Sequence, residues 1–274
     1  MDQDEVMTSR IRTAAEILLG PVTIQRHLPA SVGGGAIYAS GRVGGLKYLL
    51  KPASAWDPEL LWIAETLVRT GDSVWDVGAN VGLFSRAAGH FAGSNGAVIS
   101  IEADVDAVRL LNRTCQLSAP GHAAMTVLPI AVSEATGFIR FSIAKRARAA
   151  NAIEGFGSTQ TGGVKETRVL PCFPLDALLG HFRRPDVLKI DVEGAECMVL
   201  RGAETILRDI RPLIYCEVQD QSRAEVVGLL EGYGYVLRDG VDYRGGDDGA
   251  TVTSSTSNLV GIPQERVMAA KGSA

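Results

Sequence analysis

The sequence lacks the features that mark membrane, secreted and nucleic-acid-binding proteins. No apolar run is long enough to span a bilayer, and the acidic residues 1–10 are not followed by the apolar segment of a secretion signal. The formal net charge is −4 over 274 residues, which leaves no excess of positive charge for nucleic acid. We expect a soluble, cytoplasmic protein that binds neither membrane nor nucleic acid.

Cysteine and histidine are scarce and scattered. The four cysteines form no C-x-x-C pair and no disulfide framework, so buried, reduced thiols are expected. The four histidines form no cluster, which argues against a transition-metal site. Among them, His181 is kept as an alternative base, although a surface position is favoured for it.

The residues that are present suit one α/β domain with additions. Hydrophobic residues make up 46% of the chain, enough for a sizeable core. After residue 72, apolar strands alternate with helical patterns, which is typical of a mostly parallel sheet. The predicted strands are 73–77, 97–102, 125–132, 137–143, 166–171, 186–192, 212–218, 234–238 and 258–262. The predicted helices after the first 54 residues are 58–69, 81–91, 105–117, 195–209 and 222–231.

The first 54 residues follow a different pattern. Residues 4–19 have helical spacing and end at Gly20-Pro21, which predicts an amphipathic helix. "IYAS" and "LKYLLK" flank a glycine-rich turn and predict a hairpin. We divide the chain into an extension that covers the site or forms a homodimer contact, a core domain and a tail, at 1–54, 55–262 and 263–274. Two polar segments are interpreted as mobile loops, at 144–164 and 239–257.

The turn after the first core strand is the first candidate site. It reads "VWDVGANVGLFS" over residues 74–85. Ligands of such sheets bind beyond the carboxyl ends of the strands, and glycine there lets the backbone approach a ligand closely. Aligned on Gly78, the dinucleotide motif G-x-G-x-x-G fails at Asn80 and Leu83, and no GK[ST] follows for a phosphate loop. Asn80 suits the turn because asparagine tolerates strained backbone.

Two acidic residues end the first two core strands. Asp76 would repel a pyrophosphate, but it suits a ligand that carries an ammonium and a sulfonium. Glu102, about twenty residues past the turn, stands where a carboxylate binds ribose hydroxyls. Together they indicate S-adenosylmethionine and disfavour an NAD-dependent oxidoreductase. The simpler interpretation, that both are strand-end acids and the glycines serve packing, stays open.

The predicted strand "DVLKIDV" is the second candidate site. A central parallel strand is expected to be apolar on both faces, yet Lys189, Asp191 and Glu193 alternate with apolar residues here. Because unpaired buried charges are unfavourable, these side chains should lie at the carboxyl end of the strand or pair with one another. Glu217 adds a carboxylate from the next strand. Such a cluster could also hold Mg²⁺, which no other feature supports.

With these motifs, the chain resembles the FkbM-type S-adenosylmethionine-dependent methyltransferases over roughly residues 55–262. The resemblance rests on "GDSVWDVGANVGLFS", "ISIEADVDAVRLLNRT", "IAVSEATGFIRFSI", "FPLDALL" and, above all, "LKIDVEGAECMVLRGAETIL" followed by "RPLIYCEV". It implies a Rossmann-like class I fold, with a seven-stranded, mostly parallel sheet whose last strand is antiparallel. It also implies methyl transfer, usually to a hydroxyl of a small molecule such as a secondary metabolite or a sugar.

The resemblance assigns a role to each matched residue. The residues expected around the glycine turn, toward the methionine end of S-adenosylmethionine, are Asp76, Gly78, Ala79, Asn80 and Gly82. Glu102 is expected at the ribose hydroxyls, and Ala103 and Ala131 beside the adenine. Asp191 is expected closest to the transferred methyl group. Asp191 or Glu193 would take the proton of the acceptor hydroxyl, and Lys189 would orient one of them.

The acceptor is less well defined by the sequence. The extension and the two polar loops are expected to build its pocket, with the first loop as a lid that excludes water. Arg140, Lys145, Arg146 and Arg148 could recognise an acidic acceptor, although a solvated face is the simpler interpretation. Two further hypotheses stay open: a non-catalytic module that binds S-adenosylmethionine, and methylation of RNA or protein. The lack of a basic patch counts against RNA.

Overall fold

The structure is a computed structural model, and it describes residues 19–20, 22–41, 43, 47–117, 119–144, 151–155, 163–241, 243–245 and 250–272. The predicted helix over 4–19 lies almost entirely outside the described residues. The same holds for most of the 144–164 loop. Among the residues described, no helix is long and apolar enough to cross a membrane.

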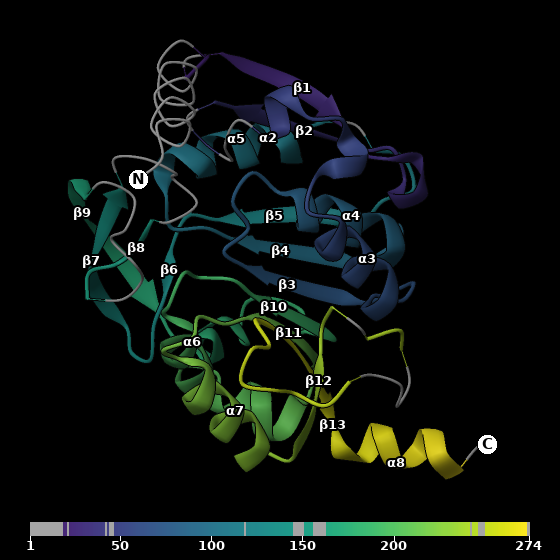
Figure 1. Ribbon diagram of the computed structural model, residues 1–274. Coiled ribbons are helices and arrows are strands. Elements are labelled where there is room, and N and C mark those ends of the chain that lie inside the picture. The colour runs from purple at the N-terminus through teal and green to yellow at the C-terminus, as the bar shows by residue number, and fades with distance from the viewer. Residues whose placement is uncertain are drawn as a thin grey trace, which may run out of the picture.

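Seven strands form the central sheet, in the order β12-β13-β11-β10-β3-β4-β5 (Figure 1). Along the chain they are β3 (Ser73–Val77), β4 (Ala97–Ile101), β5 (Ala124–Leu128), β10 (Val187–Ile190), β11 (Leu213–Glu217), β12 (Tyr235–Asp239) and β13 (Asn258–Pro263). β13 runs antiparallel to both of its neighbours, whereas the other pairs of this sheet are parallel. The predicted mostly parallel, Rossmann-like sheet with an antiparallel last strand is therefore confirmed.

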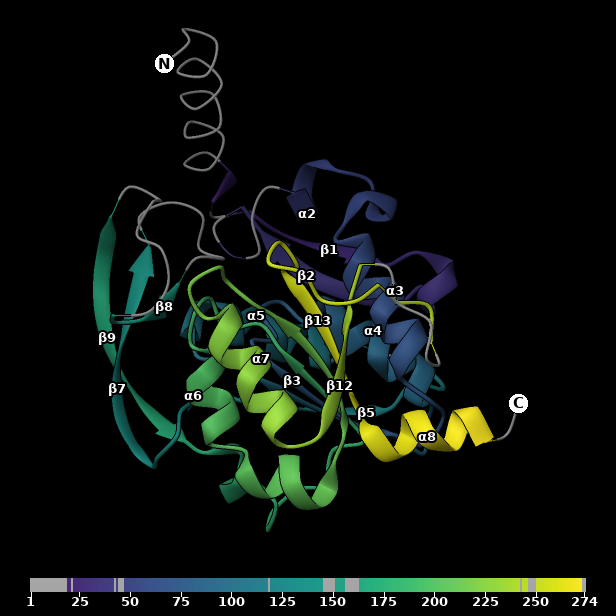
Figure 2. The ribbon, with the colours of Figure 1, turned by 60° about the horizontal axis from the view of Figure 1, so that its bottom comes forward.

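Helices cover both faces of this sheet (Figures 1 and 2). One face is covered by α3 (Pro58–Leu67), α4 (Leu83–Ala92) and α5 (Val105–Cys115). The opposite face is covered by α6 (Glu196–Arg201), α7 (Arg223–Gly232), the 3₁₀ helix η4 (Leu175–Leu178) and the π-helix η5 (Ile206–Ile210). A last helix, α8 (Gln264–Gly272), packs beside β13.

The single helix predicted over 195–209 is wrong, because the segment divides into α6 and η5. Gly202, between them, lies so close to the strand-end loop that an added Cβ would stand 2.2 Å from the Ser133 carbonyl oxygen. The carboxylate of Asp176 then accepts the backbone N–H groups of Thr205 and Ile206. Contacts with residues that are distant in the sequence therefore separate α6 from η5.

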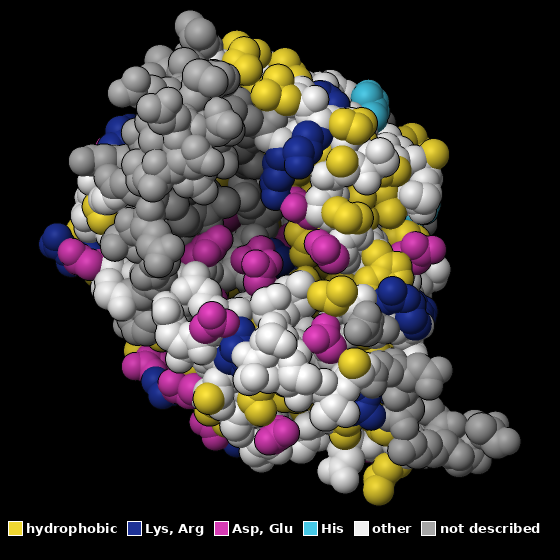
Figure 3. All heavy atoms as spheres, viewed as in Figure 1, with side chains coloured by type: hydrophobic (Ala, Val, Ile, Leu, Met, Phe, Trp, Pro, Cys, Tyr) yellow, Lys and Arg dark blue, Asp and Glu magenta, His cyan; other side chains and the backbone are white. Residues whose placement is uncertain are grey.

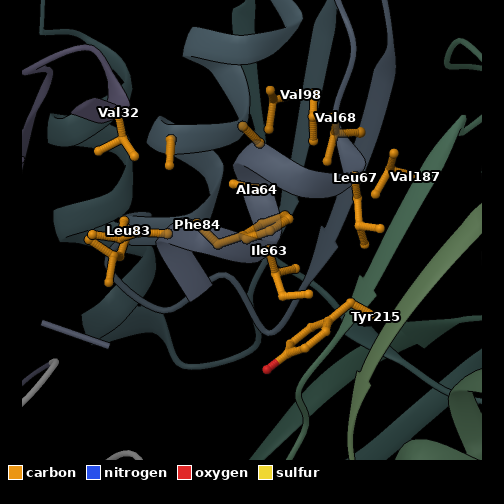
Figure 4. Close-up of a cluster of buried hydrophobic side chains, with 14 of the residues drawn as sticks. Val32, Ile63, Ala64, Leu67, Val68, Leu83, Phe84, Val98, Val187 and Tyr215 are labelled. Atoms are coloured by element: carbon orange, nitrogen blue, oxygen red, sulfur yellow. The ribbon is translucent and has the colours of Figure 1, made fainter. Parts of the chain in front are cut away.

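The strands separate their side chains by the period of two. In β3, Val74 joins the core beneath α3 and α4, while Trp75 and Val77 join the core beneath α6 and α7. Figure 4 shows the first of these cores, in which Val187 and Tyr215 from the strands lie near helical side chains such as Phe84. The sheet is thus buried on both faces, and a polar side chain on it needs a partner.

A smaller, four-stranded sheet, here called sheet C, stands beside the central sheet (Figures 1 and 2). It consists of β6 (Ala131–Val132), β7 (Gly137–Ala144), β8 (Ala152–Ile153) and β9 (Val164–Phe173). β7 pairs antiparallel with β9 and with β8. The predicted pair of strands over 137–143 and 166–171 is confirmed.

The hairpin predicted around residues 41–45 is wrong. Residues 37–40 do form a strand, β2 (Ala36–Ser40), but it pairs with the preceding β1 (Thr23–His27). The second predicted strand is instead one helical turn, α2 (Lys47–Leu50). Two short turns, η1 (Ala30–Val32) and η2 (Ala53–Ala55), complete this region. Tyr48 is held in α2 by an edge-on contact with Trp56 and a hydrogen bond to Asp57.

Candidate active site

A row of polar side chains crosses the buried centre of the main sheet. Lys189 of β10 lies in register with Asp76 of β3, and Asp76 lies in register with Ser100 of β4. All three are at most 2% exposed. Ser85 of α4 completes the row, because its hydroxyl donates to Asp76 Oδ2 over 2.5 Å and lies 2.7 Å from Ser100 Oγ. Burial of these groups is tolerated because they satisfy one another.

Lys189 joins the two motifs that the sequence singled out. Its ammonium lies 3.1 Å from Asp76 Oδ1 and 3.4 Å from Asp191 Oδ2, and it donates to the Gly78 carbonyl over 2.8 Å. Burial by itself lowers the pKa of Lys189, but the carboxylates of Asp76 and Asp191 outweigh this effect and raise it above its ordinary value. Lys189 is therefore a cation that lies between two carboxylates.

The glycine turn has the strained backbone that the sequence predicts. Gly78, Asn80 and Gly82 have φ angles of 77°, 51° and 89°, in the left-handed region. At Gly78 the turn also touches the loop after β10, since an added Cβ would lie 1.8 Å from the Asp191 carbonyl oxygen. The N–H groups of Gly78 and Ala79 donate to the carbonyl of Ile101, which fixes the turn against the end of β4.

Glu102 follows β4 and faces the glycine turn. One of its carboxylate oxygens accepts the N–H of Asn80 and the other accepts the N–H of Asp104, each over 2.7 Å. Burial raises the pKa of Glu102 to about 7, although these two bonds favour the ionised form. The carboxylate is thus held in one orientation, and each oxygen keeps a lone pair for a further donor.

A cavity of about 340 Å³ opens at the carboxyl ends of these strands. Figure 3 shows acidic side chains gathered around a hollow on this face of the molecule. The predicted site residues that line the cavity are Gly78, Ala79, Asn80, Glu102, Ala103, Ala131, Lys189, Asp191 and Glu193. Asp76 and Gly82 do not line it. Asp76 is fully buried beneath Lys189, and Gly82 packs against Leu111 of α5.

Three carboxyl groups meet at the end of the cavity beyond β10 and β11. Glu193 has a left-handed backbone with φ 53°, and its carboxylate accepts a hydrogen bond from Gln219 over 3.2 Å. Burial, followed by the charges of Asp191 and Glu217, raises the pKa of Glu193 to about 7. Glu217 lies at the exposed end of β11, where partial burial, followed by the charge of Asp191, raises its pKa to about 7 as well. Such values are typical of groups that exchange protons near neutral pH.

Comparison with known protein families identifies the kind of protein to which this cavity belongs. A model of the methyltransferase FkbM domain matches residues 76–237, which is more than half of the 274 residues. The chain belongs to the FkbM methyltransferase family. It is therefore a methyltransferase of the FkbM type. The match includes the glycine turn, Glu102 and the segment from Lys189 to Glu193.

Three solved structures to which the chain is similar are distant from it in sequence. A methyltransferase FkbM from Methylobacillus flagellatus is 13% identical, with a TM-score of 0.47, and the similarity covers 75% of this chain but only 58% of that one. The fibrillarin of Aeropyrum pernix, with natively bound S-adenosyl-L-methionine, is 13% identical over 83% of this chain and 89% of its own, with a TM-score of 0.42. An O-methyltransferase from Thermotoga maritima is 12% identical over 76% and 66%, with a TM-score of 0.42. No curated protein sequence matches the chain.

The methyltransferase cavity also contains residues that sequence reasoning missed. On the side of the extension, Asp57 accepts hydrogen bonds from Lys47 and from the Tyr48 hydroxyl, each over 2.7 Å. The Asp57-Pro58 pair correctly predicted the start of α3, but Asp57 makes no capping hydrogen bond, and its backbone is left-handed with φ 34°. Its side chain faces the cavity instead. The sequence gives no sign that the Asp57 side chain faces the cavity and does not cap α3.

All three regions expected at the acceptor pocket contribute to the cavity lining. Tyr48 comes from the extension, Ser257 from the end of the second polar loop, and Asn151 and Ile153 from the first. Phe141 of β7 lines the cavity as well; it lies within the segment "IAVSEATGFIRFSI", but sequence reasoning assigned it no role in the site.

The remaining predicted residues lie elsewhere. His181 is exposed and does not line the cavity, which agrees with its favoured surface position. Arg140 points outward on β7 and forms an ion pair with Glu154. This agrees with the simpler interpretation, in which Arg140 belongs to a solvated face. Lys145, Arg146 and Arg148 lie outside the described residues. All four cysteines are free, and in the part of the chain described no group of His, Cys, Asp or Glu is arranged to hold a metal ion.

Proposed function

We propose that this methyltransferase transfers the methyl group of S-adenosylmethionine to a hydroxyl oxygen of a small molecule. One observation carries the proposal. A single cavity joins the glycine turn and Glu102 at one end to the carboxyl groups of Glu193 and Glu217 at the other. A site for the methyl donor and a candidate base for the acceptor are thereby continuous.

The chemistry of the cavity lining fits S-adenosylmethionine. Glu102 offers oriented acceptors for ribose hydroxyls, and Asn80 and Gly78 form the turn beside it. Asp191 presents a carboxylate to the cavity, which suits an ammonium or a sulfonium. Asp76 supports this arrangement from beneath through Lys189, so we assign it a structural part in the site and not a direct contact. We assign Ala103 and Ala131, which line the cavity, to the adenine.

The same lining is unsuited to a dinucleotide. Its described residues include two lysines, and both are engaged by carboxylates: Lys47 by Asp57, and Lys189 by Asp76 and Asp191. No cation of the described lining is therefore left for a pyrophosphate, and the loop lacks the second and third glycines of the phosphate-binding motif. These observations support a methyl donor over NAD.

When bound, S-adenosylmethionine supplies the activated methyl group. The chain itself must orient the acceptor, exclude water and take the proton of the acceptor hydroxyl; orientation alone can contribute about 7–11 kcal/mol. Glu193 is the base we assign, because its carboxyl group faces the cavity and its pKa of about 7 suits proton transfer at neutral pH. Asp191 is tied to Lys189 and is assigned the orienting role.

This assignment predicts the pH dependence of the reaction. A base is active only when it has lost its proton, so kcat/KM should rise as pH increases toward about 7 and level off above it. E193Q should remove this dependence and lower kcat about 10²–10⁴-fold. Pre-steady-state or initial-rate profiles of the wild type, E193Q and E217Q would separate the two carboxyls. If E217Q and not E193Q flattens the profile, Glu217 is the base.

The acidic lining also bears on the acceptor. Carboxylates of the described cavity lining disfavour the phosphodiester backbone of a nucleic acid, which supports a small hydroxylated acceptor. An acidic acceptor is disfavoured for the same reason, and Arg140 does not reach the cavity.

Calorimetric titration with S-adenosylmethionine tests the proposal directly. We expect micromolar binding by the wild type and about 10-fold weaker binding by E102Q, since the variant loses charge-assisted acceptors for the ribose. E225Q, which alters an exposed carboxylate of α7, is the matched control. Mass spectrometry of hydroxylated compounds after incubation then detects an added methyl group. Binding without transfer to any acceptor, small or macromolecular, would favour the non-catalytic alternative.

A further inference from the structure

The buried side-chain amide of Asn151 joins sheet C to the loop that follows β4, which contains Glu102. Asn151, which precedes β8, is 8% exposed and lines the cavity. Its Oδ1 accepts the N–H of Ala144 at the end of β7, and its Nδ2 donates to Asp104 Oδ2, each over 2.8 Å. One side chain therefore holds the end of β7 and reaches the loop that follows β4.

Asp104 passes this contact on to Glu102. Its side chain is nearly fully buried and caps α5 by accepting the N–H of Asp106, while its own N–H donates to Glu102 Oε1 over 2.7 Å. Arg168 of β9 approaches the same carboxylate, with Nη1 3.1 Å from Asp104 Oδ1. Arg168 of sheet C and Asn151, which precedes β8, thus fix the backbone that orients the Glu102 carboxylate.

Sheet C also supplies an apolar wall to the same end of the cavity. Phe141 of β7 and Ile153 of β8 are direct partners in the antiparallel register, so their side chains share one face of the sheet. Both line the cavity, as do Ala103 and Ala131 from the loops that follow the central strands. An aromatic ring and an aliphatic side chain form the kind of surface on which a flat, apolar base packs.

We propose that sheet C completes the nucleoside subsite, with Phe141 and Ile153 against the adenine and with Asn151 and Arg168 as positioning residues that act through Asp104 on Glu102. This inference rests on the proposed binding of S-adenosylmethionine. The nucleoside subsite then consists of the loops at the ends of the central strands together with a surface from outside the central sheet. It also gives the Asn151–Asp104 and Arg168–Asp104 contacts a role in affinity and not only in stability.

Calorimetry with two probes, S-adenosylmethionine and adenosine, tests the proposal on the full chain. N151A and R168M should each weaken the binding of both probes about 10-fold, since each loses a bond to a buried carboxylate. N151D should weaken it more, because it places a second carboxylate against Asp104. R168K keeps a cation and should recover part of the affinity. R140M is the matched control, an outward-facing arginine on the same sheet.

The melting temperature without ligand separates positioning from folding. We expect N151A and R168M to bind more weakly even where this temperature stays close to that of the wild type. F141L, which keeps apolar volume but removes the ring, should weaken adenosine binding without disturbing the hydrogen bonds. Wild-type affinity in N151A, R168M and F141L, or an equal loss in R140M, would overturn the inference alone. A folded wild type that binds neither probe would overturn the proposed function and the inference with it.

Discussion

Replacing Gly78 by alanine is expected to abolish the binding of S-adenosylmethionine and to destabilise the chain by about 2–6 kcal/mol. Two effects add. The φ angle of 77° is unfavourable for any residue with a Cβ, and the new methyl group would lie 1.8 Å from the Asp191 carbonyl oxygen. Backbone cannot move away as a flexible side chain can. Relief therefore requires the glycine turn and the loop after β10 to separate, and these are the two sides of the cavity.

The chain offers a matched control for this prediction. Gly71 also has a positive φ, of 91°, but nothing lies within 4 Å of the position an added Cβ would take. G71A therefore carries the backbone strain without the collision, and it should be destabilised by about 1–3 kcal/mol with normal ligand binding. Urea unfolding and calorimetry on both variants measure the difference. Equal effects in G71A and G78A would show that the contact with Asp191 is not tight in solution.

The parts of the site that follow the central strands could be predicted from the sequence for a physical reason. Parallel strands end at the same edge of the sheet, so Asp76, Glu102 and Asp191 had to come near one another once the strands were recognised. The charges on β10 were informative because a buried strand cannot carry unpaired Lys189. Which of these side chains line the cavity and which support others from beneath could not be predicted. Asp76 lies beneath the cavity because its partner, Lys189, is in register with it.

Contacts made across long stretches of chain could not be predicted from local pattern. Residues 37–40 read correctly as a strand, but its partner precedes it, and pairing partners are chosen by the fold as a whole. Residues 47–50 alternate well enough for a strand, yet the hydrogen bond from Tyr48 to Asp57 favours a helical turn. Asn151 gave no signal either, since its partner Asp104 lies 47 residues earlier in the chain.

The second large effect is expected from Lys189. Replacing it by methionine, which keeps the length of the side chain, should destabilise the chain by about 3–5 kcal/mol. Lys189 is 2% exposed, and its ammonium is the ion partner of Asp76, which has no solvent exposure. In K189M the Asp76 carboxylate retains the hydrogen bond from Ser85 but loses its counter-charge. Breaking a buried pair is unfavourable because it leaves a charge without compensation.

Urea unfolding of the wild type and of K189M measures this loss of stability. K165M, at an exposed lysine of β9, is the matched control and should unfold as the wild type does.

The double variant K189M/D76N decides whether the pair or the lysine alone is responsible. Removing both charges leaves a neutral amide beside a thioether, so most of the stability lost in K189M should return. Binding of S-adenosylmethionine should not return with it. Asp191 would still lack the Lys189 ammonium, which lies 3.4 Å from its carboxylate in the wild type. The Gly78 carbonyl would still lack its hydrogen-bond donor. A double variant as unstable as K189M would show that Lys189 acts through Gly78 and Asp191 and not through Asp76.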